Sequence, residues 1–320
     1  MSTTLSLLAA SSYEISALDS ALTNLLEPWG GMGAFVKPGD RVLLKPNLLT
    51  ASRPQGECIT RPELVYCVAQ QVKAVGGKPF IGDSPAFGTA QGVLRSNGYS
   101  ELLAALDIPV VEFQGERYPV ENQRFNHLRL SKEALAADVV INLPKVKSHV
   151  QLTLTLGVKN LFGCVPGKTK AWWHLEAGKD VERFGEMLVE TARAINPTLT
   201  IMDGIIGQEG RGPINGTPRS LGVLAACPDV FALDWVMAQI LRVPPQQVPT
   251  LAAQQRLGLV PQELHFPLAQ PESLQVQDWQ LPETLMPIDF GLPRVLRSTL
   301  KHFYIRFIRE PLLTIPALME

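Results

Sequence analysis

Short runs of Val, Ile and Leu, which alternate with stretches of helical periodicity, constrain the possible fold of this chain more than any other sequence feature. Runs that are too short for helices occur at residues 41–44, 78–81, 137–142, 199–202 and 221–226. Helical patterns lie between or after them, at residues 62–74, 100–106, 180–195 and 230–241. This alternation predicts an α/β fold with a mainly parallel, doubly wound sheet.

Polar residues follow these runs at the points where the strands are expected to end. They are Lys45 and Asn47, Asp83 and Ser84, Asn142 and Lys145, Asp203, and Asp229. Because the carboxyl ends of parallel strands lie along one edge of a sheet, we expect these side chains to converge on a single crevice. Asp, Asn and Ser are ordinary turn residues but lysine is not, so the repeated lysines favour a ligand site.

The stretch from residue 143 to residue 167 is the densest part of this pattern. It holds Lys145, Lys147, Lys159 and His149 among Gly, Thr and Asn, without an amphipathic repeat. We interpret it as a loop whose lysines bind a carboxylate or a phosphate. Of these lysines, Lys147 is the one that we expect to point to solvent.

Two histidines and two aspartates are candidates for chemistry at the crevice. His149 and His174 suit general acid–base catalysis near neutral pH or metal ligation, and a structural role is the alternative for each. Asp83 and Asp203 could hold a divalent cation through oxygen ligands, or could cap the following elements. For Asp229, which directly precedes an expected helix, we favour a helix cap.

The composition limits the classes of protein to which this chain can belong. With 29 Lys and Arg against 30 Asp and Glu, the formal net charge is −1, which argues against a nucleic-acid-binding protein. The four cysteines are scattered without a CxxC pair, a spacing that indicates neither a zinc site nor a bound iron–sulfur cluster. The N-terminus lacks the basic region of a signal peptide, and no run of about 18 apolar residues occurs. We therefore expect a reduced, cytoplasmic protein.

The chain divides into two parts by composition. Residues 1–241 carry the strand–helix alternation and form the expected α/β core with the ligand crevice. Residues 242–320 are rich in Pro and Gln, and we expect an irregular peripheral extension that ends in a basic amphipathic helix over residues 294–309. We expect this helix to dock on its own domain, and the alternatives are a second copy or an anionic membrane surface.

Several motifs resemble the family known as domain of unknown function 362, whose members are often labelled iron–sulfur cluster-binding proteins. The motifs occur in the family's order across residues 41–241: KPNL at 45–48, GDSP at 82–85, LPKVKSH at 143–149, GVKNLFG at 157–163, PG at 166–167, His174, DGI at 203–205 and GRGP at 210–213. They cover about two-thirds of the chain and together are specific. The resemblance implies no established reaction.

These motifs complete the set of expected site residues. The expected ligand-binding residues are Lys45, Asn47, Ser84, Lys145, Asn160, Gly163, Gly167 and Arg211, and the expected catalytic residues are His149, His174 and Lys159. Many family members carry a ferredoxin-like module with CxxCxxC motifs, which is missing here, so we expect no iron–sulfur cluster in this chain alone. More loosely, His149 and the Gly-Val-Lys-Asn stretch look like the lactate racemase family, which implies small-carboxylate chemistry.

Two classes of function remain open from the sequence. The first is an enzyme or cofactor-processing protein that acts on an anionic small molecule, with lysines as the clamp, histidines as acid and base, and a separate ferredoxin as an optional electron donor. The second is a non-catalytic ligand-binding or assembly factor that docks through its C-terminal helix.

Overall fold

The computed structural model describes residues 2–50, 57–122, 124–167, 169–177 and 180–288, together with Leu300 and Tyr304. The α-helices are α1 (Ile15–Leu26), α2 (Pro62–Ala74), α3 (Ala90–Ser96), α4 (Tyr99–Ala104), α5 (Lys132–Leu135), α6 (Gly157–Leu161), α7 (Thr169–Ala177), α8 (Val181–Ile195), α9 (Val230–Ile240) and α10 (Pro249–Arg256). Short 3-10 turns are η1 (Glu27–Trp29), η2 (Met32–Ala34), η3 (Phe162–Cys164), η4 (Pro245–Gln247) and η5 (Pro271–Leu274).

The strands form one large sheet and two small ones. They are β1 (Thr3–Thr4), β2 (Ser6–Ala9), β3 (Arg41–Pro46), β4 (Lys78–Gly82), β5 (Val110–Val111), β6 (Gly115–Pro119), β7 (His127–Ser131), β8 (Val139–Leu143), β9 (Lys145–His149), β10 (Thr153–Thr155), β11 (Leu199–Glu209), β12 (Thr217–Cys227) and β13 (Leu264–His265). The large sheet has nine strands in the order β10-β9-β11-β8-β3-β4-β5, and β12 joins β11 to β2.

Pairing within the large sheet is mostly parallel in its centre. β3 pairs in parallel with β4 and β8, β8 pairs in parallel with β11, and β11 pairs in parallel with β9. Antiparallel pairs occur on the other side, where β12 lies between β11 and β2 and where β10 folds back on β9. The expected mainly parallel α/β sheet is therefore confirmed.

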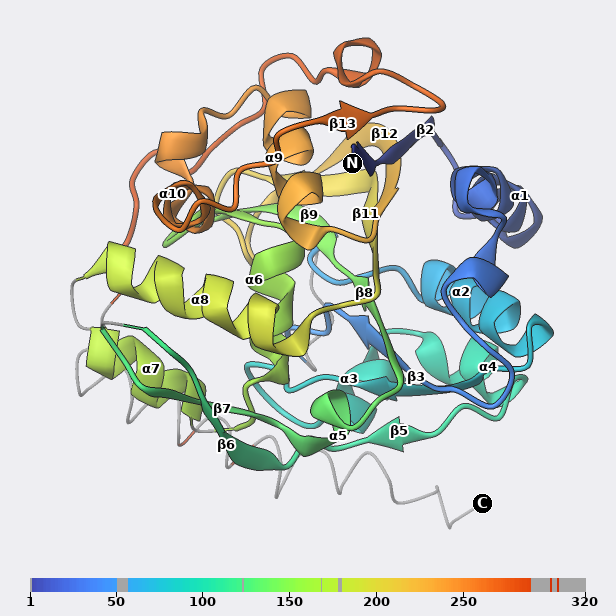
Figure 1. Ribbon diagram of the computed structural model, residues 1–320, viewed down its shortest axis with the longest axis horizontal. Coiled ribbons are helices and arrows are strands. Elements are labelled where there is room, and N and C mark those ends of the chain that lie inside the picture. Colours follow the sequence, from blue (N-terminus) through green and yellow to red (C-terminus); the bar gives the residue numbers. More distant parts are fainter. Residues whose placement is uncertain are drawn as a thin grey trace, which may run out of the picture.

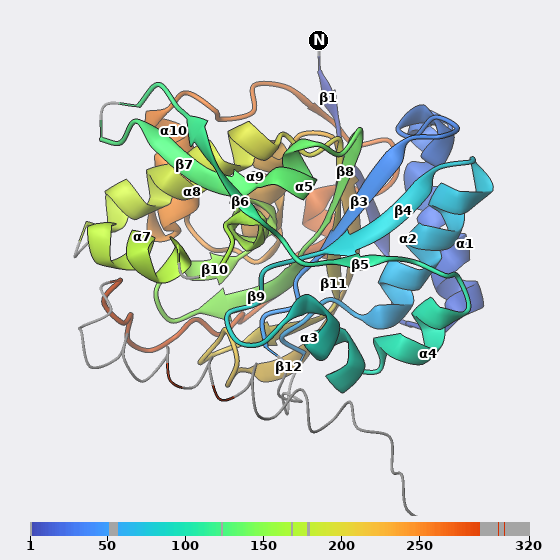
Figure 2. The ribbon, with the colours of Figure 1, turned by 90° about the horizontal axis from the view of Figure 1, so that it is seen from below.

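Helices cover both faces of this sheet (Figures 1 and 2). Successive strand residues point to opposite faces, so Val42 and Leu44 pack with the buried sides of α1 and α2, whereas Leu43 packs with α6 and α8. The same alternation directs Lys45 to the α6 side, because it lies two residues beyond Leu43. Because helices cover both faces of the sheet, the face to which a polar residue at a strand end points determines which helices it contacts.

Local signals set several elements as expected. α2 begins at Pro62, whose fixed φ and missing N–H suit the first helical turn, and its bounds are those predicted. α9 is capped by Asp229, whose side chain accepts hydrogen bonds from the amides of Phe231 and Ala232. The predicted cap is therefore confirmed.

One expectation about the central polar stretch and one about Asp203 are wrong. Residues 145–149 form the buried strand β9 instead of a loop, because β11 offers them a parallel partner and the sheet continues past β8. Asp203 does not follow a strand end either. It lies inside β11, which continues to Glu209 because β12 pairs with it along its whole length.

The end of the chain extends the core at its periphery. Between residues 242 and 288, α10 packs against α8, and β13 pairs with β1 at the N-terminus. The expected basic helix over residues 294–309 lies outside the described residues, apart from the exposed Leu300 and Tyr304. The proposed division at residue 241 stays a prediction. Within the described ranges, no helix is both long and apolar enough to cross a membrane.

Candidate functional site

A buried ion pair joins the ends of two adjacent parallel strands. The Nζ atom of Lys45 lies 2.9 Å from Oδ1 of Asp83, and the exposed fractions of the two side chains are 0% and 5%. Parallel pairing of β3 with β4 sets these residues side by side. Asp83 also accepts hydrogen bonds from the backbone amides of Leu48 and Ser84, both at 2.9 Å. These contacts orient the side chain of Asp83 toward Lys45.

A second ion pair lies on the face covered by α1 and α2. Lys145 and Asp203 are register partners in β9 and β11, and Nζ lies 3.1 Å from Oδ2. The hydroxyl of Tyr13 donates to the other carboxylate oxygen at 2.5 Å. Glu57 lies 3.3 Å from Lys145 and 3.2 Å from the guanidinium of Arg61. We call these five residues the paired cluster, because its two cations match its two carboxylates.

Three asparagines connect the strand ends to α6. The amide nitrogen of Asn160 donates to the carbonyl of Lys45 at 3.1 Å and to Oδ1 of Asn142 at 2.8 Å, and its oxygen accepts from Asn47 at 2.9 Å. The start of α6 is held separately by Asp234, whose two oxygens accept from the amides of Gly157 at 2.7 Å and Val158 at 3.0 Å. α6 is therefore fixed on both sides of Lys159.

Lys147 is 1% exposed, so the expectation that it points to solvent is wrong. Its Nζ donates to Oδ1 of Asn47 at 2.8 Å and to the carbonyl of Cys58 at 2.5 Å. Both acceptors are neutral. Burial without a carboxylate partner lowers the pKa of Lys147 to about 8, and the neighbouring Lys145 and Lys45 act in the same direction.

Lys159 and Lys170 lie over one aromatic ring. Their Nζ atoms are 4.6 Å and 5.7 Å from the centroid of Phe162, and Lys170 also donates to the carbonyl of Ser84. Burial, followed by repulsion from neighbouring lysines, lowers the pKa of Lys159 to about 7. Burial lowers the pKa of Lys170 to about 8. Lys170 was not among the expected residues, although its place after Gly167 in a basic turn is a usable signal.

We call Lys45, Lys147, Lys159 and Lys170 the lysine cluster. Asp83 forms an ion pair with Lys45, and its negative charge raises the pKa of the other three lysines against the effect of burial. Within the described ranges, four lysines thus share one carboxylate, in contrast to the balanced paired cluster. An anion would relieve the mutual repulsion of these lysines.

The two histidines lie beside the lysine cluster in different environments. His149 accepts a hydrogen bond at Nδ1 from the amide of Gln151 at 3.1 Å, so its neutral ring carries the hydrogen on Nε2. Burial and the nearby Lys159 and Lys147 hold the pKa of His149 well below its usual range. His174 donates from Nδ1 to the carbonyl of Ile288 at 3.0 Å and packs 4.5 Å from the ring of Phe184.

Two glycines of the expected site have steric or hydrogen-bonding roles. A Cβ on Gly163 would lie 2.0 Å from Oδ1 of Asp83 and 2.4 Å from Nζ of Lys45, so this position admits no side chain. The amide of Gly167 donates to the hydroxyl of Ser84 at 3.0 Å. Gly163 therefore lets the turn after α6 approach the strand ends closely, whereas Gly167 has open space around it and adopts a positive φ of 57°.

The structure gathers most of the expected residues at the carboxyl edge of the sheet, divided between two clusters. Lys145 and Asp203 belong to the paired cluster, and the others surround the lysine cluster. Arg211 is exposed and makes no hydrogen bond or ion pair within the described ranges. Sequence reasoning missed Tyr13, Glu57 and Arg61, which precede the central stretch by many residues and carry no local motif.

Asp83 and Asp203 are both engaged by lysines and backbone amides, including the amide of Arg61 on Asp203 at 3.0 Å. Among the described residues, no three His, Cys, Asp or Glu side chains are grouped as metal ligands would be. These contacts give both aspartates an electrostatic role, and metal binding by either stays a prediction.

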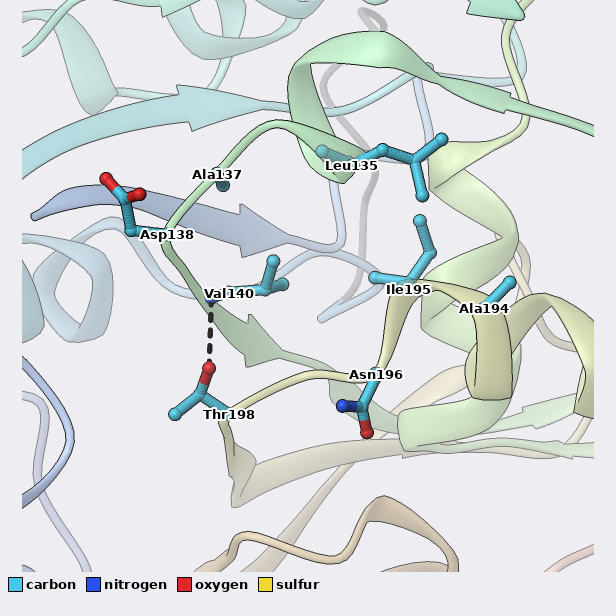
Figure 3. Close-up of a pocket in the computed structure, with 9 residues that line it drawn as sticks. Leu135, Ala137, Asp138, Val140, Ala194, Ile195, Asn196 and Thr198 are labelled. Atoms are coloured by element: carbon cyan, nitrogen blue, oxygen red, sulfur yellow. Dashed lines mark hydrogen bonds between the residues drawn. The ribbon is translucent and has the colours of Figure 1, made fainter. Parts of the chain in front are cut away.

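A cavity of about 240 Å³ lies at the opposite edge of the sheet (Figure 3). Its lining includes Asp138 and Val140 at the start of β8, and Asn196 and Thr198 just before β11. These positions are at the amino ends of the strands, away from every lysine described above. In parallel α/β sheets ligands bind outside the carboxyl ends, so the chemistry and this cavity do not coincide.

Comparison with known proteins places the chain in a family. The model of the family described as domain of unknown function (DUF362) matches residues 42–239, which is more than half of the chain. The chain belongs to the DUF362 family. The resemblance of the motifs across residues 41–241 is thereby confirmed, and the two clusters are built mainly from this DUF362 region.

One relative and one solved structure are similar to this DUF362 chain. The thylakoid-associated protein sll1697 of Synechocystis sp. is 69% identical over 309 residues, covering 96% of both chains. The lactate racemase apoprotein of Thermoanaerobacterium thermosaccharolyticum is 12% identical, covering 73% of this chain and 57% of that chain, with a TM-score of 0.46. Structural likeness at that score supports no conclusion about activity.

Proposed function

We propose that the lysine cluster binds an anionic small molecule through a carboxylate or phosphate group. The observation that carries this proposal is the charge imbalance of four lysines around Asp83, in surroundings that lower the pKa of three of them. A bound anion restores their charged state and supplies acceptors for their N–H groups. The paired cluster has no such deficit.

The residues beside the cluster fit an enzyme or a cofactor-processing protein better than a passive binder. His149 is neutral and presents an Nε2–H donor, and Lys159, with a pKa of about 7, can take up or release a proton at neutral pH. A purely structural site does not require an unpaired lysine. An external electron donor such as a ferredoxin stays part of the proposal for any redox step.

Calorimetric titration of the purified full-length chain with inorganic phosphate, and separately with oxalate, tests the proposal. We expect Lys170→Gln to weaken anion binding by roughly tenfold to a hundredfold, because one charge-assisted contact contributes about 1.5–3 kcal/mol. Lys78→Gln is the matched control, since Lys78 is exposed at the start of β4, at the opposite edge of the sheet.

The binding of neither anion, or equal losses in the Lys170 and Lys78 variants, would contradict the proposal. Binding of both anions without turnover of any carbonyl or phosphate ester would favour the alternative, a non-catalytic ligand-binding or assembly factor.

We also propose that the chain works at the surface of a thylakoid membrane. The support is the name of the relative that is 69% identical over nearly its whole length. A peripheral location on the cytoplasmic side would agree with the expected cytoplasmic protein. The contact would come from the basic amphipathic pattern of residues 294–309, for which docking on its own domain is the expectation from the sequence and a membrane surface the alternative. Full-length protein should sediment with anionic vesicles and not with neutral ones, and a chain ending at residue 293 should remain in the supernatant. Equal sedimentation of the two chains would contradict this.

A further inference from the structure

Lys159 differs from the other members of the lysine cluster. Lys45 donates to the carbonyl of its neighbour Pro46 at 2.7 Å, and Lys147 and Lys170 donate to the acceptors described above. Lys159 makes no hydrogen bond or ion pair within the described ranges. Its one described polar contact is with the face of the Phe162 ring, 4.6 Å from Nζ. As a whole residue Lys159 is intermediate in exposure, as is Lys170, whereas Lys45 and Lys147 are buried. Within the described ranges, its amine is therefore the one in the cluster that no protein acceptor engages.

The backbone around this amine is held from both sides. Asp234 binds the amides of the two residues before it, and the side chain of Asn160 binds β3 and β8 through Lys45 and Asn142. A short helix fixed in this way presents its lysine in one place relative to the cluster. Such preorganisation is what a reacting group needs and a solvated surface lysine lacks.

We propose that Lys159 is a nucleophile that forms an imine with a carbonyl compound, whose phosphate or carboxylate group is held by the other lysines of the cluster. This inference rests on the proposed function and adds its reaction class. The neutral Nζ adds to the carbonyl carbon, and the resulting carbinolamine loses water. One C=O bond and one amine thus become one C=N bond and one water molecule, without an oxidant or a reductant.

The charges around Lys159 favour the neutral amine that this step requires. Lys45, Lys147 and Lys170 approach it from β3, β9 and α7, and Asp83, after β4, opposes them. The result is a pKa of about 7, so about half of the amine is neutral at pH 7, against roughly one molecule in a thousand or fewer for an ordinary lysine. From β9, neutral His149 offers the Nε2–H that could donate to the carbonyl oxygen.

Reductive trapping on the full-length chain tests this inference. The probe is pyridoxal 5′-phosphate, an aldehyde with a phosphate group, added at pH 7 and followed by borohydride, which reduces the imine to a stable secondary amine. Peptide mass mapping then locates the label. We expect Lys159 to be labelled on the order of a hundredfold faster than exposed Lys78, and inorganic phosphate to protect it. Lys159→Arg, which keeps a cation at this position but has no amine that can form an imine, should lose this label.

The outcomes separate this inference from the proposed function. If phosphate binds but the label spreads over exposed lysines and spares Lys159, the imine is wrong and the anion site stands. If phosphate neither binds nor protects, the proposed function is wrong, and the imine proposal falls with it. Because the labelling is mapped on the unaltered chain, the result does not depend on whether the arginine variant folds.

Discussion

At the scale of single residues, Gly163 is the most demanding position of the site. We predict that Gly163→Ala destabilises the fold by about 3 kcal/mol, because the added Cβ would overlap Asp83 and Lys45 and separate a buried ion pair. Urea unfolding measures the loss. Gly33→Ala is the control, since its Cβ would meet only a side-chain carbon of Val75 at 3.8 Å. Equal stability of the two variants would show that the pair tolerates separation.

The lowered pKa of Lys159 predicts a pH dependence of stability. Between pH 7 and pH 10 the unfolded chain holds the proton of this lysine more tightly than the folded chain, so its contribution to the unfolding free energy rises with pH. Stability of the unaltered chain relative to Lys159→Gln should therefore increase from pH 6.5 to pH 9. Lys78→Gln, measured at the same two pH values, is the control. A difference that stays constant or falls with pH would contradict the assignment.

The sequence predicts which residues belong to the site better than it predicts the burial and the partners of those residues. Lys45, Asp83 and Lys145 stood out because each follows an apolar run, and a parallel sheet brings such positions together. The burial of Lys147 could not be predicted, since it depends on Asn47 and Cys58, which lie about a hundred and about ninety residues away in the chain. No local pattern records such contacts.

At the scale of elements, the site depends on where α6 begins. We predict that Asp234→Asn weakens phosphate binding and destabilises the chain by about 1–3 kcal/mol, because an NH2 donor replaces one of the two oxygens that accept from Gly157 and Val158. Calorimetry and urea unfolding measure the two effects. Asp180→Asn should change stability by less than about 0.5 kcal/mol, since asparagine caps a helix as well as aspartate does and the ion pair of Asp180 with Arg124 is exposed.

Helices were easier to predict than the strands that surround the site. α2 and α8 carry clear periodicity and end signals, so their bounds agree with the sequence expectation. β9 has the sequence Lys-Val-Lys-Ser-His, in which polar side chains are buried by the site itself. A polar strand of this kind lacks the apolar signal on which strand prediction relies, and so it was expected to be a loop.

At the scale of the whole molecule, the N-terminal residues complete the sheet. Leu7 is fully buried in β2, which pairs with β12, so we predict that Leu7→Ala costs about 2–5 kcal/mol of unfolding free energy. Leu285→Ala is the matched control, because Leu285 is 55% exposed. Thermal and urea unfolding should show a large loss for the first variant and almost none for the second. A loss for Leu7→Ala as small as that for Leu285→Ala would mean that β2 contributes little to the stability of the fold.

The hydrogen bonds of the site join residues that are far apart in the chain: 113 positions separate Asn47 from Asn160, and 190 separate Tyr13 from Asp203. Contacts of such long range form late, because a large loop must close before they contribute. During synthesis or refolding, anion binding should therefore appear only with the final kinetic phase. A labelled ligand added to a refolding mixture would then bind only fully folded molecules, so the bound label would measure the fraction of native protein without any signal from intermediates.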